Sequence, residues 1–332
     1  MENRNIRWAI MGTGYIANRF AQGMMQVKDA TLAAVVSRGA EKGREFAGKY
    51  GGGAVYTDLE GMLAEAKPDV LYIGTPNDCH YAAIVAALNA GVNVLSEKPI
   101  VDNRRQLDEV MALAKEKGLF LMEGMWTRCF PAVRKARKWI GEGKIGKPLT
   151  VRAYFDIQSD PDDWQWWKAG IEHAGGALRD VGIYALAMAD MVFPRMPVKM
   201  HTAMESNGEV DLSFHMLMDY GEGQHAFLGG AFNQISGHEA EIVGEKGRIL
   251  IGPEFWHPTM AAFIGNDGST ETFKQPYPAT GFQYEIEIVQ ACLRGGEKQC
   301  PFYGWADSIR ITDQIEAARK EWGIYYKADG KD

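Results

Sequence analysis

The first part of the chain alternates short apolar runs with amphipathic stretches, and this alternation limits the possible folds most strongly. Ile6–Met11, Leu32–Val36 and Val70–Ile73 read as strands, and Ile16–Met25 has the spacing of a helix. Strands that alternate with helices predict βαβ units and a parallel sheet. The strands lack polar alternation, which is typical of a sheet covered by helices on both faces. Further helices are expected at Ala40–Tyr50, Tyr81–Ala90 and Asn103–Lys117, and further strands at Ala54–Tyr56, Val92–Leu95 and Leu119–Met122.

Beyond Phe130 the pattern changes to segments in which apolar and polar residues alternate, as in antiparallel strands with one buried face. We therefore expect an α/β protein. A Rossmann domain with a doubly wound parallel sheet would occupy residues 1–125. An α+β domain on a large, mostly antiparallel sheet would occupy residues 126–332, with the C-terminal helix packing back on the first domain. Strands are expected at Leu149–Ile157, Met200–Ser206, Asp211–Asp219, Gln224–Phe232, Ala240–Val243 and Arg248–Ile251, and helices at Ala132–Glu142, Ala177–Val192, Phe282–Leu293 and Ala306–Trp322.

Length and composition narrow the class of protein. A chain of 332 residues is long enough for two domains. Its net charge of -7 argues against a broad basic face for nucleic acid or an anionic membrane. No apolar run approaches the roughly 18 residues that span a bilayer, so no membrane partner is expected. The four cysteines form no Cys-x-x-Cys pair, which favours thiols in a reducing cytoplasm over a metal site.

A G-x-G-x-x-A motif follows the first strand and opens the first helix. Gly12 permits the tight turn, Gly14 lets the backbone approach a pyrophosphate, and the small Ala17 lets helix and strand pack closely. Glycine-rich turns are common, but this one lies in the strand–turn–helix context that dinucleotide binding requires. Thr13, Tyr15 and Ile16 belong to the same predicted cofactor turn.

The end of the second strand indicates which dinucleotide is bound. An NAD enzyme usually has an acidic residue there for the ribose 2′-hydroxyl. This chain has Ser37 and Arg38 instead, with Lys42 one helical turn later. These residues could bind a 2′-phosphate, so NADP is favoured over NAD. The alternative is a solvated arginine in a loop.

Polar residues after the next two strands are candidates for cofactor contact, because the carboxyl ends of parallel strands face the ligand crevice. After Val70–Ile73 these are Thr75, Pro76, Asn77 and His80, although His80 could instead cap the helix that follows. After Val92–Leu95 the chain reads Ser96-Glu97-Lys98-Pro99. Pro99 restricts the backbone, so Lys98 is expected beside the nicotinamide, with Glu97 next to it.

Taken in order, G-x-G-x-x-A, T-P-N-x-x-H and Glu97-Lys98-Pro99 resemble the glucose–fructose oxidoreductase, inositol dehydrogenase and rhizopine-catabolism (Gfo/Idh/MocA) family. Residues 118–131 and 175–184 are similar to its dihydrodiol and sugar dehydrogenase members. The resemblance implies an NADP-dependent oxidoreductase acting on a sugar, polyol or vicinal diol. It also implies a homodimer paired through the second-domain sheet.

The resemblance also assigns residues to the reaction. It implies that Lys98 and Tyr184 frame the reacting carbon, with Asp180 one helical turn before the tyrosine. Free tyrosine has a pKa near 10, and a neighbouring lysine ammonium would favour the phenolate that takes the hydroxyl proton. Alternatively, Tyr184 is a core aromatic residue and Asp180 a cap or salt-bridge partner. Trp126 and Arg128 would line the cofactor site or form a packing pair.

Two other functions and one loop remain open. A non-catalytic dinucleotide-binding sensor could share this fold, although it would need neither Lys98 nor Tyr184. An NAD-dependent glycoside hydrolase of the same superfamily is the second alternative, and the Ser37-Arg38 pair argues against it. The loop with Trp164, Trp166 and Trp167 could cover the substrate or be pinned by buried tryptophans.

Overall fold

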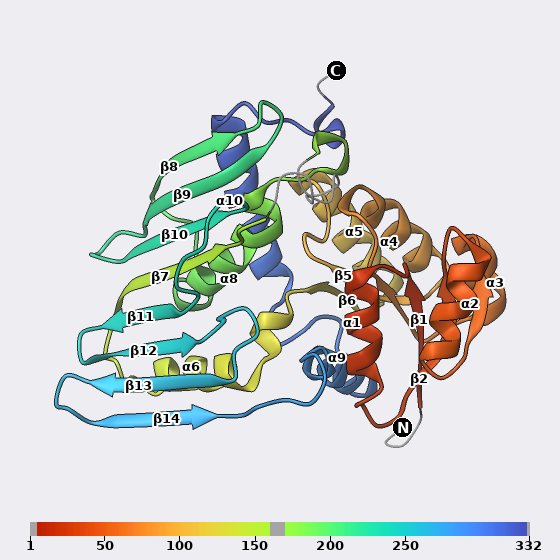
Figure 1. Ribbon diagram of the computed structural model, residues 1–332, viewed down its shortest axis with the longest axis horizontal. Coiled ribbons are helices and arrows are strands. Elements are labelled where there is room, and N and C mark those ends of the chain that lie inside the picture. The colour runs from red at the N-terminus through yellow and green to blue at the C-terminus, as the bar shows by residue number, and fades with distance from the viewer. Residues whose placement is uncertain (1–4, 160–169, 331–332) are drawn as a thin grey trace. The chain divides into compact units, whose positions relative to one another are not determined.

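The computed structural model describes residues 5–159 and 170–330, and the chain forms two compact units (Figure 1). The first unit contains Met1–Gly124 and Tyr277–Trp305, and the second contains Met125–Pro276 and Ala306–Asp332. Residues 277–305 therefore group with the Rossmann half, although the sequence assigned them to the second domain. No helix among the described residues is both long and apolar enough to cross a bilayer.

The first unit is built on a six-stranded parallel sheet with the order β3-β2-β1-β4-β5-β6 (Figure 1). This is the strand order of a doubly wound dinucleotide-binding fold, as predicted. The central strands are buried on both faces, and every residue of β4 is buried. The strands are β1 Ile6–Met11, β2 Ala30–Val36, β3 Ala54–Tyr56, β4 Val70–Ile73, β5 Asn93–Glu97 and β6 Leu121–Gly124. The helices are α1 Tyr15–Met24, α2 Ala40–Lys49, α3 Leu59–Ala66, α4 His80–Asn89, α5 Arg104–Lys117 and α9 Gln283–Gly295.

Local signals account for the helix ends of this unit. Asn103 caps α5 by accepting a hydrogen bond from the backbone N–H of Gln106, and Gly118 closes the helix with a φ of 62°. Helix α3 is absent from the sequence prediction, although its cap signal is present. Asp58 accepts a hydrogen bond from the N–H of Gly61 at 2.6 Å.

The second unit is built on an eight-stranded sheet with the order β14-β13-β12-β11-β7-β10-β9-β8. All neighbouring strands are antiparallel except β10 and β7. The expected mostly antiparallel sheet is therefore confirmed. The strands are β7 Pro148–Asp156, β8 Lys199–Ser206, β9 Asp211–Asp219, β10 His225–Ala231, β11 Ala240–Gly244, β12 Gly247–Gly252, β13 Met260–Gly265 and β14 Thr270–Lys274. Strands β13 and β14 were not predicted.

Helices of the second unit cover one face of this sheet. Helix α8, Ile183–Val192, packs against β7 and β10, and α6, Pro131–Gly141, packs against β12, β13 and β14. Helix α10, Trp305–Glu321, joins α8 through the ion pair between Arg310 and Asp190. The helix predicted at Ala177–Val192 is confirmed with these bounds, and its first turn, Leu178–Gly182, is a π-helix.

Candidate active site

Most of the predicted cofactor residues follow β1, β2, β4 and β5 at the carboxyl edge of the parallel sheet. The strand order reverses between β1 and β4, because the chain moves outward to β3 on one side and to β6 on the other. Open parallel sheets bind ligands at such a reversal, outside the carboxyl ends of the strands. The topology of the first unit therefore brings these loops to the edge where a dinucleotide is expected.

The glycine-rich turn after β1 has the shape that a bound phosphate requires. Gly12 has a φ of 107°, and a Cβ on it would lie 2.6 Å from the carbonyl oxygen of Gly74. Gly14 begins α1 without a capping side chain, and no atom lies within 4 Å of the Cβ position on it. This open space lies over uncapped backbone N–H groups of a helix, a combination that suits a pyrophosphate.

Asn18 supports this turn, and the sequence analysis did not single it out. Its Nδ2 donates to the carbonyl oxygens of Thr13 at 3.1 Å and Gly14 at 2.9 Å. Its Oδ1 accepts a hydrogen bond from the hydroxyl of Tyr50 at 2.8 Å. The signal was available, since an asparagine in the first turn of a helix often bonds to backbone groups before that helix.

The end of β2 presents a hydroxyl and two cations. Ser37 is buried, with its Oγ 3.4 Å from the Oγ1 of Thr13, whereas Arg38 and Lys42 are exposed. Arg38 also lies close enough to Cys79 to act on its thiol, whose pKa is raised by burial and then by Asp78 and lowered less by Arg38.

The loop after β4 contains one hydroxyl without a protein partner. Thr75 Oγ1 is buried and makes no hydrogen bond with the described residues. His80 is fully buried, and its two ring nitrogens each lie 2.9 Å from a backbone carbonyl oxygen, that of Thr75 and that of Pro99. Its ring thus links the loop after β4 to the loop after β5. Pro76 and Asn77 lie half-buried on the same loop.

Lys98 follows β5 at the same edge and is half-buried. Its backbone N–H donates to Glu97 Oε2 at 3.3 Å, and the other oxygen of Glu97 accepts a hydrogen bond from the hydroxyl of Tyr72 at 2.7 Å. Glu97 is buried and is held by these groups. The Glu97 carboxylate therefore accepts a hydrogen bond from the backbone of Lys98 and helps to hold that backbone in place.

Tyr184 lies in the first turn of α8, in the second unit. It is 8% exposed, and its ring centroid is 5.6 Å from that of Phe155 on β7. Asp180 lies one turn earlier, in the π-helix, and is half-buried. A π-turn changes the direction of a helix locally and often occurs at functional sites.

Half-buried aromatic side chains surround Phe155 beside Tyr184. The Phe155 ring stacks on Trp256 with centroids 3.6 Å apart and an interplanar angle of 8°. The His238 ring lies 4.8 Å from Trp256, and the Thr127 hydroxyl donates to the Trp256 carbonyl oxygen at 2.6 Å. Trp164, Trp166 and Trp167, which were considered as a cover for the substrate or as a loop pinned by buried tryptophans, lie outside the described residues.

Trp126 and Arg128 occupy buried positions in the second unit. The Trp126 ring lies 5.6 Å from that of His257. Arg128 donates to the carbonyl oxygen of Ala187 at 2.7 Å and lies within 4 Å of the carboxylates of Asp190 and Asp307. Arg128 is therefore held by groups of the second unit, and the roles predicted for Trp126 and Arg128 at the cofactor site stay predictions.

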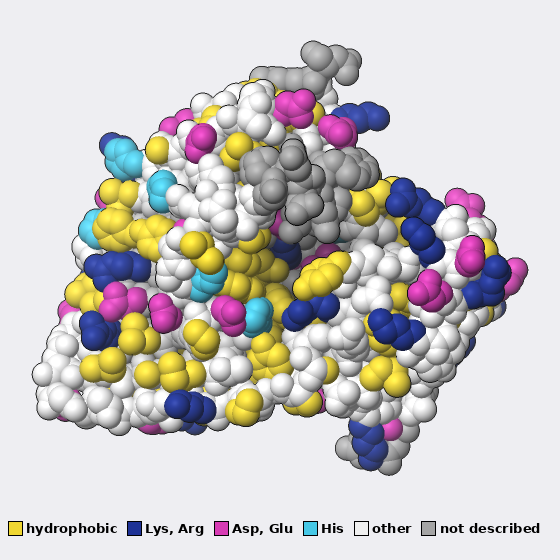
Figure 2. All heavy atoms as spheres, viewed as in Figure 1, with side chains coloured by type: hydrophobic (Ala, Val, Ile, Leu, Met, Phe, Trp, Pro, Cys, Tyr) yellow, Lys and Arg dark blue, Asp and Glu magenta, His cyan; other side chains and the backbone are white. Residues whose placement is uncertain are grey.

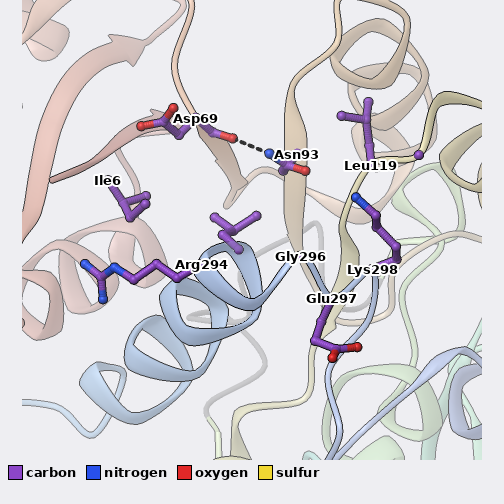
Figure 3. Close-up of a pocket in the computed structure, with 10 residues that line it drawn as sticks. Ile6, Asp69, Asn93, Leu119, Arg294, Gly296, Glu297 and Lys298 are labelled. Carbon is purple, nitrogen blue, oxygen red and sulfur yellow. Dashed lines mark hydrogen bonds between the residues drawn. The ribbon is translucent and has the colours of Figure 1, made fainter. Parts of the chain in front are cut away.

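A cavity of about 260 Å³ lies at the opposite, amino edge of the parallel sheet (Figure 3). Asp69, Asn93, Arg294 and Lys298 are among its lining residues, and the Asn93 side-chain amide donates to the Asp69 carbonyl oxygen at 2.7 Å. Side chains of both charges line this cavity, and none of its charged residues belongs to the motifs above. Within residues 5–159 and 170–330, no cluster of histidine, cysteine and acidic residues could hold a metal ion.

Comparison with known proteins gives matches over nearly the whole chain. Residues 6–125 match the oxidoreductase family with an NAD-binding Rossmann fold, and residues 133–250 match the GFO/IDH/MocA C-terminal domain. Trans-1,2-dihydrobenzene-1,2-diol dehydrogenase of Sus scrofa is 31% identical, with 98% of this chain and 99% of that protein covered. The Bos taurus enzyme of that name is 30% identical with the same coverage.

Solved structures of two other oxidoreductases share the fold. Aldose–aldose oxidoreductase from Caulobacter crescentus complexed with glycerol matches with a TM-score of 0.85 at 25% identity, covering 96% of this chain and 97% of that one. A 3-ketoreductase from Actinomadura kijaniata in complex with NADP and TDP-benzene matches with a TM-score of 0.80 at 25% identity, covering 96% and 98%.

Proposed function

Because this chain belongs to the GFO/IDH/MocA oxidoreductase family, we propose that it oxidises a ring-bearing vicinal diol or sugar-like alcohol with NADP as hydride acceptor. The family and its relatives establish that the chain is an NAD(P)-binding oxidoreductase that acts on CH–OH groups. The proposal adds the cofactor preference, the substrate class and the residues that carry the reaction.

The glycine-rich turn carries the proposed cofactor site. The open space over Gly14, the buried Thr75 hydroxyl, which makes no hydrogen bond with the described residues, and the uncapped start of α1 fit a pyrophosphate and ribose. Exposed Arg38 and Lys42 supply positive charge where an NAD enzyme would have an acid, which favours a 2′-phosphate. When bound, the nicotinamide supplies a hydride acceptor at its C4.

Two side chains would handle the substrate hydroxyl. We assign Tyr184, as phenolate, to accept the hydroxyl proton while the C–H hydride leaves for the cofactor. We assign the Lys98 ammonium to stabilise the phenolate and the developing alkoxide. The alcohol would thereby become a carbonyl compound, with its hydroxyl proton on Tyr184 and its hydride accepted by bound NADP⁺. In the reverse direction Tyr184 returns its proton to the oxygen. Asp180, one turn before Tyr184, would orient the substrate.

The aromatic group beside Tyr184 supports a substrate with an apolar ring. Phe155, Trp256 and His238 present half-buried ring faces next to the proposed acid–base residue. Such faces pack on aryl rings and on the apolar side of sugars. The diol named in the two dehydrogenase relatives has such a ring, and the Caulobacter crescentus neighbour is named for aldoses.

A substrate panel with matched variants tests this proposal. Cyclic trans-diols and aldoses are incubated with NADP or NAD, and the absorbance of reduced nicotinamide is followed. We expect turnover by wild type and losses on the order of 10²-fold to 10⁴-fold in Lys98→Met and Tyr184→Phe, with bound NADP retained. NADP binding without turnover of any member would favour a sensor and contradict the proposal. Turnover unaffected by both variants would contradict the residue assignment.

A further inference from the structure

Buried side chains hold the backbone on both sides of the Lys98–Pro99 peptide, and one of them has no role in the proposed reaction. Glu123, on β6, is 4% exposed, and its Oε1 accepts a hydrogen bond from the N–H of Ile100 at 3.0 Å. Its Oε2 accepts a hydrogen bond from the hydroxyl of Tyr303 at 3.2 Å. Tyr303 is 1% exposed and comes from the segment that returns to the first unit.

A carboxylate at this position of β6 has a cost. Its neighbours along the strand, Leu121 and Met122, are buried apolar residues, so packing alone would favour an apolar side chain. Burying an ionised carboxyl group is unfavourable unless hydrogen bonds compensate for the lost water. Here the compensating donors are a backbone N–H two residues after Lys98 and a phenol. Through its hydrogen bond with the Ile100 N–H, the Glu123 carboxylate fixes the loop that follows β5.

The Glu123 contact is one of three that act on consecutive backbone groups. The Lys98 N–H donates to Glu97, the Pro99 carbonyl oxygen lies 2.9 Å from His80 Nδ1, and the Ile100 N–H donates to Glu123. These side chains come from β5, α4 and β6, so three elements of the sheet and its helices fix one tripeptide. A lysine side chain is long and flexible, and its ammonium is delivered to a defined place only if its backbone is fixed.

We infer that Glu123, braced by Tyr303, is a positioning residue that holds Lys98 in its reactive place. The inference rests on the proposed function, because it assumes that Lys98 acts on the substrate oxygen. Glu123 itself touches neither substrate nor cofactor in this scheme. Its effect on turnover passes through Ile100 and the Lys98–Pro99 backbone. The inference also gives a function to the segment Tyr277–Trp305, because its Tyr303 hydroxyl orients the Glu123 carboxylate.

Three variants test separately the hydrogen-bond acceptor of Glu123, the negative charge of Glu123 and the Tyr303 hydroxyl that donates to it. Glu123→Leu removes the acceptor for the Ile100 N–H at similar volume, and we expect kcat to fall about 10-fold to 100-fold, since small misplacements of reacting groups cost this much. Glu123→Gln keeps an acceptor oxygen and should lose at most about threefold in kcat. Tyr303→Phe removes only the bracing hydroxyl and should lose about 3-fold to 10-fold. In all three, the dissociation constant of NADP, measured by quenching of protein fluorescence, should change less than about threefold.

A double-mutant cycle with Lys98→Met identifies how Glu123 acts. If Glu123 works by placing Lys98, adding Glu123→Leu to Lys98→Met should cost less than about twofold, because the group to be placed is already missing. An equal cost in both backgrounds would mean a general structural role and would overturn the inference. If Glu123→Leu does not fold, the same cycle with Tyr303→Phe decides between the two roles. Lys98→Met with full activity would instead overturn the role assigned to Lys98 in the proposed function, on which the inference rests.

Discussion

Arg38 is the side chain on which the proposed choice between NADP and NAD depends most. It follows β2, is exposed to solvent and has Ser37 and Lys42 close to it in sequence. A hydrogen bond to a charged group contributes about 1.5–3 kcal/mol, and each 1.4 kcal/mol is a factor of about ten.

Arg38→Ala is therefore expected to raise the KM for NADP about 10-fold to 100-fold and to change the KM for NAD less than about twofold. Steady-state kinetics with both cofactors measure this ratio. Arg44→Ala, an equally exposed arginine on α2, is the matched control and should leave both constants near their wild-type values. If the KM values for NADP and NAD rose equally in Arg38→Ala, Arg38 would not contact the 2′-phosphate.

Single residues also show what the sequence could and could not predict about the site. Gly12, Gly14 and Lys98 were identified because the glycine pattern and the strand-end position each have a local signal. The contacts of His80 had none, because its partners include the carbonyl oxygen of Pro99, 19 residues away. Glu123 looked like one polar residue at the end of an apolar run, and only the folded sheet brings Ile100 to it.

Among the elements, the turn between β1 and α1 allows a test of whether the cofactor pyrophosphate lies over Gly14. An alanine Cβ at Gly14 meets no atom within 4 Å, and the φ of -78° there suits any residue. Gly14→Ala should therefore leave the thermal stability of the cofactor-free protein unchanged.

The added methyl group would, however, occupy the space that the pyrophosphate needs. We expect the affinity for NADP and for NAD to fall by about tenfold or more, measured by calorimetric titration. Gly48→Ala, another glycine with no atom near its Cβ position, should leave the cofactor affinity unchanged and, because it lies inside α2, should raise the thermal stability slightly. Unchanged cofactor affinity in Gly14→Ala would contradict a pyrophosphate over this turn.

The π-helix that precedes α8 supports a prediction about pH. Asp211 Oδ2 accepts a hydrogen bond from the Leu178 N–H at 2.6 Å, and burial raises the pKa of this carboxyl group to about 6. The folded state therefore binds the proton more tightly than the unfolded chain. The resulting stabilisation is fully present below about pH 4 and is lost as the pH rises through about 6.

Asp211→Asn keeps an acceptor for Leu178 and removes the titration. Between about pH 4 and pH 7, the free energy of unfolding of wild type should fall relative to this variant by on the order of 2–3 kcal/mol. Urea unfolding of both proteins across this range measures the difference. A difference independent of pH would mean that Asp211 has the same pKa in the folded and unfolded chain.

Elements with strong periodicity were predicted well, and those with weak signals were not. The boundaries of β1, β3, β4 and β9 agree with the sequence prediction. Strand β13 was missed because its sequence, Met260–Gly265, contains no polar residue and so shows no alternation, and β14 was missed because it is an edge strand of five residues with a single apolar side chain. The helix at Ala177–Val192 was predicted with its bounds, but the π-turn at Leu178–Gly182 has no signature in the apolar periodicity.

At the scale of the whole molecule, chain order did not predict how the segments group. Tyr277–Trp305 follows the second sheet in sequence but belongs to the first unit. Its α9 packs on α1, with the Phe282 ring 5.9 Å from that of Phe20, and the Thr280 hydroxyl donates to the Arg19 carbonyl oxygen at 2.8 Å. Such contacts join residues more than 250 positions apart, so no local pattern predicts them.

The uncovered face of the eight-stranded sheet supports the proposed homodimer. Leu217 and Phe227 are 37% and 38% exposed on this face, among charged residues such as Arg152 and Glu241. Figure 2 shows hydrophobic side chains between charged and histidine side chains over this sheet. Exposed apolar surface of this kind commonly marks an interface.

Light scattering should therefore give twice the chain mass of 36.8 kDa. Phe227→Glu together with Leu217→Glu should give the monomer, because two charges would have to be buried in the interface. Met25→Glu, at a residue 55% exposed in the first unit, is the control and should remain a dimer. A monomeric wild-type protein at micromolar concentration would remove the homodimer from the account.

The central claim is that Lys98 and Tyr184 serve a hydride transfer from a CH–OH carbon to NADP. The most direct measurement uses a cyclic trans-diol deuterated at its carbinol carbons and follows the label into the cofactor by mass spectrometry. The account predicts NADPH that carries one deuterium with wild type, and none detectable over the same time with Lys98→Met or Tyr184→Phe. Reduced cofactor without the label, or label transferred equally by both variants, would contradict it.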